Sequence, residues 1–141
     1  MNDLILEQLA NKLYEIGKEM GFSKPVIRSS RYSSEIYIIK EHALQLEIDW
    51  RENELFMYVV RLKDRTLPDR NVIYSYEDGQ WCRKYLEEIY KTKRPRIKDR
   101  NKRYSAEYLL DRFAFYEQLI NGAPQILTEF YKSIGTGEQQ T

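Results

Sequence analysis

The stretch Leu44-Gln45-Leu46-Glu47-Ile48-Asp49-Trp50 alternates strictly between apolar and polar side chains. Even positions are apolar and odd positions are polar. Because successive side chains of a β-strand point to opposite faces of the sheet, this alternation predicts a strand with one face on the core and the other toward water. The segments on either side of it are expected to belong to the same sheet.

Before this strand, the sequence predicts one helix and two further strands. Apolar residues recur at helical spacing over residues 3–20, and Gly21 stands where that helix would end. Residues 26–31 and 35–40 are rich in β-branched and aromatic side chains and are separated by a short polar turn. These two segments would form a meander with the alternating strand.

After the alternating strand, residues 55–62 are apolar at nearly every position. This pattern predicts a strand that is covered on both faces and lies in the middle of the sheet. Residues 63–70 have the composition of a loop, and residues 71–76 are predicted to form a last short strand. The links between consecutive strands are too short for parallel crossovers, so the sheet should be antiparallel.

Three helices are predicted in the last part of the chain. Asp78 is a candidate N-cap for a helix over residues 79–91, and Ser105 for one over residues 105–122. The last helix covers residues 124–134 and begins with a proline, which is tolerated in a first helical turn. The order of elements predicts an α+β fold: an N-terminal helix, an antiparallel meander of four to five strands, and three C-terminal helices packed on the sheet.

Composition predicts one globular domain in a reducing compartment. The chain has 141 residues, of which 42% are hydrophobic and 13% aromatic, so residues 1–134 are expected to form a single domain with a frayed tail at 135–141. Cys82 is the sole cysteine, which excludes an intrachain disulfide. The N-terminal segment lacks the features of a signal peptide, and no segment has the about 20 apolar residues that span a bilayer. We therefore expect a cytoplasmic protein with no membrane partner.

Residue types that carry catalysis or bind metals are scarce. His42 is the sole histidine and is expected in a surface turn, whereas Cys82 is expected to be a small core residue, so nothing supports a catalytic dyad. Two such residues are too few for a structural zinc site. The six glycines form no phosphate-binding pattern. These observations favour a protein that is not an enzyme and uses no metal or cofactor.

One pair of carboxylates raises an alternative. Glu47 and Asp49 lie on the same face of the alternating strand, about 7 Å apart by strand geometry. Two carboxylates so placed could hold a magnesium ion or act as an acid and a base. The interpretation we favour is a solvated strand face, paired across the sheet with Arg61 or Lys63.

The same face also has the character of a binding surface for a protein. Its acidic residues are interleaved with aromatic side chains, and such a surface suits a basic protein partner, since charge complementarity speeds encounter and aromatic anchors supply affinity. The predicted partner is a basic protein, such as a toxin or nuclease domain. The predicted binding residues are Glu47, Asp49, Glu52, Glu54, Trp50 and Tyr58.

In size, expected compartment and acidic surface, the chain resembles small bacterial immunity proteins and other toxin inhibitors. The resemblance implies an inhibitor or adaptor that blocks a basic active site. No motif accompanies it, so no binding residue is transferred from that class.

The charge of the chain is divided unevenly. The tract KTKRPRIKDRNKR, residues 91–103, holds eight basic residues and one acidic residue, a formal charge of +7. The whole chain has 23 basic and 22 acidic residues, so the remainder has 15 and 21, a formal charge of −6. The near-neutral total therefore conceals a basic tract within an acidic body.

The basic tract supports a second function class, accessory nucleic-acid binding. Its cations could neutralise phosphates, and the flanking Tyr90 and Tyr104 could stack on bases. Two further interpretations are a solvated connector and a segment whose cations fold back on the acidic sheet. The oligomeric state stays open. The candidate phosphate-binding residues are Lys91, Lys93, Arg94, Arg96, Lys98, Arg100, Lys102 and Arg103.

Overall fold

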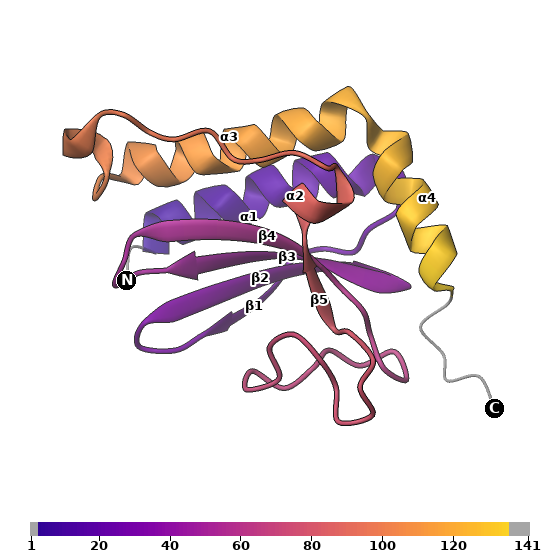
Figure 1. Cartoon of the computed structure of the whole chain (residues 1–141). Coiled ribbons are helices and arrows are strands. Elements are labelled where there is room, and N and C mark those ends of the chain that lie inside the picture. The colour runs from indigo at the N-terminus through magenta and orange to yellow at the C-terminus, as the bar shows by residue number, and fades with distance from the viewer. Residues whose placement is uncertain (1–2, 136–141) are drawn as a thin grey trace.

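The computed structural model describes residues 3–135 and confirms the α+β fold (Figure 1). An N-terminal helix precedes a five-stranded antiparallel sheet with the order β1-β2-β3-β4-β5, and helices follow the sheet. The elements, in chain order, are α1 (Asp3–Gly17), η1 (Lys18–Met20), β1 (Val26–Ser29), β2 (Ser33–Lys40), β3 (His42–Asp49), β4 (Glu54–Val60), β5 (Arg83–Tyr85), α2 (Leu86–Ile89), η2 (Arg100–Lys102), α3 (Ala106–Gly122) and α4 (Pro124–Ile134).

The helices cover one face of the sheet. Figure 1 shows α1 and α3 side by side above the strands, with α4 crossing at one end. The apolar positions of β3, Leu44, Leu46 and Ile48, are fully buried beneath them. Since apolar side chains gain about 25 cal/mol for each Å² removed from water, this layer supplies most of the hydrophobic stabilisation.

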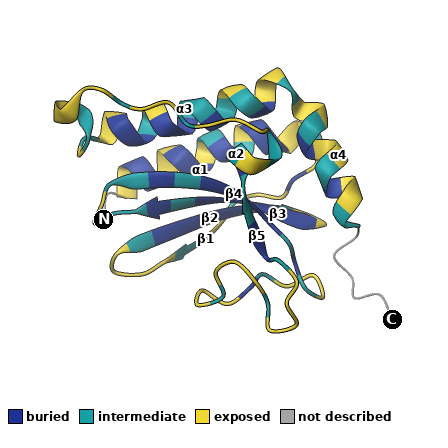
Figure 2. Ribbon diagram, in the orientation of Figure 1, coloured by how far each residue is buried: buried dark blue, intermediate teal, exposed yellow. Residues whose placement is uncertain are grey.

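The other face of the sheet is covered in part by the long connection between β4 and β5, residues 61–82. Figure 2 shows this connection as largely exposed chain beneath dark, buried strands. A second, smaller apolar cluster forms here from Tyr37, Ala43, Tyr58, Val60 and Leu62. The polar side of the alternating strand therefore does not simply face water.

β4 is covered on both faces as predicted, but β3, and not β4, is the middle strand.

The region from residue 71 to residue 91 differs most from the sequence prediction. No strand forms at 71–76, and the helix predicted over 79–91 is reduced to the four residues of α2. Asp78 accepts a hydrogen bond from the Gln80 amide, so it caps a turn and not a helix. The chain then returns to the sheet as β5, because β4 would otherwise present unpaired backbone groups at the sheet edge.

The prediction that His42 lies in a surface turn is also wrong, because its side chain is fully buried. The turn between β2 and β3 is tighter than predicted, with Glu41 at a φ of 60°, so residue 42 already belongs to β3. His42 Nδ1 accepts from the Leu62 amide at 3.1 Å, and Nε2 lies 3.0 Å from the Gly135 carbonyl oxygen, to which it donates. Burial lowers the pKa of His42, which keeps the imidazole neutral.

Several helix ends form as the sequence predicts. Gly21 follows η1 with a φ of 91°, and the Ser105 hydroxyl accepts from the Tyr108 amide at 3.2 Å. α4 begins at Pro124 and closes at Gly135. Of the tail predicted to fray, 136–141 lies outside the described residues.

Candidate functional site

A hollow of about 560 Å³ opens on the helix-free face of the sheet, between the strands and the long β4–β5 connection. We call it the sheet hollow. Strands β2, β3, β4 and β5 form its floor, and the connection supplies one wall. It is lined by Ser30, Ser33, Glu35, Glu47, Tyr58, Arg70, Ile73, Tyr74 and Arg83.

Two carboxylates face each other on the floor of the sheet hollow. Glu35 of β2 and Glu47 of β3 are direct cross-strand partners, so they project from the same face. Glu35 is buried, and Arg70 Nε donates to its Oε1 at 3.0 Å. The hydroxyl of Tyr37 and the amide of Gln45 donate to the other oxygen of Glu35. Glu35 is therefore satisfied within the protein.

Arg83 of β5 holds the wall of the sheet hollow in place. Its buried guanidinium donates to Gln45 Oε1 at 2.6 Å and to the Tyr37 hydroxyl at 3.1 Å. It also donates to the carbonyl oxygens of Val72 and Ile73 in the connection. One cation thus joins three strands to the covering chain, which accounts for a buried arginine at this point.

Glu47 has a different environment from Glu35. Its described hydrogen bond comes from the Tyr58 hydroxyl at 3.3 Å, and within residues 3–135 it forms no ion pair. Burial raises the pKa of Glu47, and the neighbouring charge of Glu35 raises it further. A half-buried carboxylate of this kind is stabilised by any cation that enters the hollow.

Aromatic rings line the hollow next to Glu47. Tyr58 and Tyr74 line it, and Tyr85 lies between them. The ring centroids of Tyr58 and Tyr85 are 4.7 Å apart, and the hydroxyl oxygens of Tyr85 and Tyr74 are 3.3 Å apart. On the rim, Ile73 and Tyr74 expose 56% and 55% of their surfaces. A carboxylate beside tyrosine faces can receive an ammonium or a guanidinium group through both charge and cation–π attraction.

The six residues predicted for the acidic face do not share one surface. Glu47 and Tyr58 meet in the sheet hollow. Asp49 ends β3 and Glu52 lies in the turn that follows, where the Asp49 carboxylate accepts from the Glu52 amide at 3.0 Å. Trp50 is half-buried, and its indole N–H donates to the Ser34 hydroxyl at 2.8 Å. Neither Arg61 nor Lys63 pairs with the strand carboxylates; Lys63 binds Asp78 at 3.2 Å.

Glu54, the sixth residue, lies at the centre of a group of basic and phenolic side chains. Tyr108 donates to it at 2.7 Å, Arg94 forms an ion pair with it, and Arg103 and Arg112 each approach to 3.7 Å. We call these five residues the Glu54 cluster. Burial alone would raise the pKa of Glu54, but the Tyr108 hydroxyl, the Leu55 amide and Arg94 together lower it.

The Glu54 cluster shows how part of the basic tract folds back on the protein. Arg94 also donates to the Leu55 carbonyl oxygen at 2.9 Å, and Arg103 donates to the carbonyl oxygens of Glu52 and Asn53. Lys102 pairs with Glu107 of α3 at 3.0 Å. Three of the eight basic residues therefore have partners within the body of the protein.

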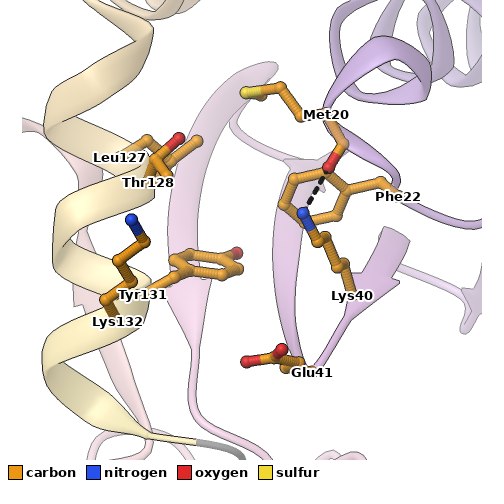
Figure 3. Close-up of a pocket in the computed structure, with 8 residues that line it drawn as sticks. All are labelled: Met20, Phe22, Lys40, Glu41, Leu127, Thr128, Tyr131 and Lys132. Carbon is orange, nitrogen blue, oxygen red and sulfur yellow. Dashed lines mark hydrogen bonds between the residues drawn. The ribbon is translucent and has the colours of Figure 1, made fainter.

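A second, smaller hollow lies between α4 and the β2–β3 turn (Figure 3). It has a volume of about 130 Å³, and the ring of Tyr131 projects into this region from α4 beside Phe22. The Lys40 ammonium closes one side by donating to the Met20 carbonyl oxygen at 2.7 Å. Since cavities of about 150 Å³ hold a benzene-sized group, the space suits one small apolar group and no more.

The sole cysteine and histidine are both engaged with the backbone. Cys82 Sγ lies 3.2 Å from the Ile73 carbonyl oxygen, and burial raises the pKa of the thiol. Both ring nitrogens of His42 bind main-chain groups, as described above. Neither residue lines the sheet hollow.

The sequence predicted two residues of the sheet hollow, Glu47 and Tyr58, and missed most of the others. Alternation places Glu47 on the polar face, and the cross-strand register could have placed Glu35 beside it. Arg70 and Arg83 gave no local signal, because the path of residues 61–82 brings them to the hollow.

No protein family model, no curated protein and no solved structure matches this chain. Within residues 3–135, no helix is both long and apolar enough to cross a membrane.

Proposed function

We propose that this protein is a non-enzymatic binding protein that docks a basic protein partner over the sheet hollow. The observation that carries the proposal is Glu47, a half-buried carboxylate without a cationic partner within residues 3–135. A lysine or arginine side chain of the partner would enter the hollow and bind this carboxylate. The partner class is a basic toxin or nuclease domain, and the role is that of an immunity-type inhibitor or adaptor in the bacterial cytoplasm.

The surroundings of Glu47 favour a macromolecular partner. The rim residues Ile73 and Tyr74 are more than half exposed, and aromatic residues at a rim supply contact area with little loss of conformational freedom. Asp49 and Glu52 add negative charge at the adjoining turn, which would speed encounter with a basic surface. The proposed surface leaves out Glu54 and Trp50, since Arg94 forms an ion pair with Glu54 and the indole of Trp50 donates to the Ser34 hydroxyl.

The test is capture of partners from a lysate of the host, with three baits and with and without nuclease. The baits are the natural chain, Glu47→Gln, and the matched control Glu7→Gln, whose carboxylate is exposed on α1 on the other side of the sheet. We expect a protein that the natural chain and the control retain after nuclease treatment and that Glu47→Gln loses. A partner that disappears with nuclease, or that Glu47→Gln retains, contradicts the proposal.

Calorimetry with the purified partner then measures the contribution of the carboxylate. Leaving a partner cation buried without its counterion costs several kcal/mol, so Glu47→Gln should weaken Kd by about 30-fold or more. The Kd of the control, Glu7→Gln, should stay within about twofold of that of the natural chain. Equal affinity of Glu47→Lys and the natural chain would show that the hollow is not the docking site.

A further inference from the structure

Five residues of the basic tract remain unneutralised. In contrast to Arg94, Lys102 and Arg103, these five are exposed and form no ion pair within residues 3–135. They lie on one continuous stretch of chain, residues 91–100, which we call the basic strip. Its residues are Lys91, Lys93, Arg96, Lys98 and Arg100.

The backbone that carries the basic strip is fixed at several points. Near its middle, Arg94 donates to the Leu55 carbonyl oxygen of β4 at 2.9 Å, and Arg112 donates to the Pro95 carbonyl oxygen at 2.6 Å. At its end, the Asp99 carboxylate accepts from the Asn101 amide at 2.9 Å. Because these contacts already order the chain, a ligand that binds the strip pays little additional backbone entropy.

The basic strip lies away from the sheet hollow. Figure 1 shows the chain between α2 and η2 drawn out along α3, in the helical layer, whereas the hollow opens on the helix-free face. Screening reduces the repulsion from acidic residues elsewhere, since the Debye length is about 8 Å at physiological ionic strength. The formal charge of −6 on the chain outside residues 91–103 therefore does not prevent an anion from binding here.

The form of the strip favours a linear polyanion. Its cations recur every two or three residues, and all but Arg100, the first residue of η2, lie outside the helices and strands. Fully extended chain would place them about 7 to 10 Å apart. Ile97, the apolar residue within it, is half-buried against the core and so offers nothing to insert into a bilayer. Beside the strip, Tyr104 exposes 71% of its surface even though the Arg103 guanidinium carbon lies 5.2 Å from its ring centroid, so the ring offers exposed area on which a base can stack.

We propose that the basic strip binds single-stranded nucleic acid through its phosphates, without reading base sequence. The strip supplies the charge and Tyr104 supplies a stacking face. This site is independent of the sheet hollow, so the protein would carry two binding surfaces for two partners of opposite charge.

The test is fluorescence anisotropy with a labelled oligouridine of about 20 nucleotides. Five phosphate contacts predict a slope of log K against log salt of about −3.5 between about 50 and 200 mM salt. The triple variant Lys93→Gln/Arg96→Gln/Lys98→Gln removes three contacts, so the slope should fall in magnitude by about 2 and the affinity by at least about tenfold. Tyr104→Ala should weaken binding about fivefold or more with the salt slope unchanged.

The matched control is Lys24→Gln/Arg31→Gln/Lys132→Gln, which removes three exposed cations outside the tract. It should bind within about twofold of the natural chain. Unchanged thermal unfolding of both triple variants establishes that the fold is intact. Absence of binding at about 50 mM salt, equal losses in both triple variants, or binding to phosphatidylserine vesicles but not to the oligonucleotide would overturn the proposal.

Discussion

Glu47 and Glu54 lie on neighbouring strands of one sheet, yet their electrostatic surroundings are opposite. Glu54 is bound by Arg94 and Tyr108, with two further arginines nearby, and its pKa is lowered. Glu47 receives one hydroxyl from Tyr58, and its pKa is raised. A carboxylate whose charge is neutralised inside the protein stabilises the fold, whereas one that lacks a counterion is available to a partner.

The largest effect is expected from Glu54→Gln. This change leaves Arg94, Arg103 and Arg112 without their shared carboxylate, and breaking a buried ion pair from one side costs about 3 kcal/mol. Urea unfolding should therefore show a free energy of unfolding that is lower by about 3 kcal/mol than that of the natural chain. Glu52→Gln, at an exposed position of the adjoining turn, should change it by less than about 0.5 kcal/mol. Equal effects of the two changes would mean that the Glu54 cluster contributes nothing specific.

Glu47→Gln should have the opposite sign. It removes a half-buried charge that forms no ion pair within residues 3–135 and retains an oxygen for the Tyr58 hydroxyl, so the free energy of unfolding should rise by about 0.5 kcal/mol or more. The same change should weaken partner binding by about 30-fold or more. A residue whose replacement stabilises the fold and removes function is a binding residue. A loss of more than about 1 kcal/mol would assign Glu47 to the fold instead.

The contrast between the two glutamates could be predicted only in part from the sequence. The alternation at residues 44–50 places Glu47 on the polar face, as observed. By the same alternation Glu54 faces the same way, because it pairs with Asp49 across the strands. However, β5 pairs only with Tyr58–Val60, so on the side away from β3 the start of β4 has no neighbouring strand among the described residues. Arginines distant in sequence occupy that edge, and no local pattern reveals them.

The fold was predictable wherever one segment determines its own structure. The alternating strand, the first helix and the last two helices each carry a periodic pattern, and each is confirmed. The prediction failed at residues 71–91, where helical spacing in the sequence competes with the unpaired edge of β4. Tertiary pairing determined the outcome there, and with it the positions of Arg70 and Arg83 in the sheet hollow.

The smallest effects should appear in the titration of the two carboxyl groups, which can be measured without a partner. From an ordinary pKa of 4.5, that of Glu54 is lowered and that of Glu47 is raised. Glu54 therefore contributes stability that is present above about pH 4.5 and is lost as the pH falls through its folded pKa. Glu47 favours the folded state only below about pH 4.5, and this contribution is lost as the pH rises through its folded pKa.

Carboxyl carbon chemical shifts, assigned with the two glutamine variants, measure both pKa values in one sample. We expect the Glu47 signal to titrate at higher pH than the Glu54 signal. Adding a basic partner should then lower the pKa of Glu47 and leave that of Glu54 in place, because a cation in the sheet hollow favours the ionised form of the nearby carboxylate. If both signals titrate together, or if the partner moves the Glu54 signal instead, the two carboxylates do not have the separate roles assigned to them.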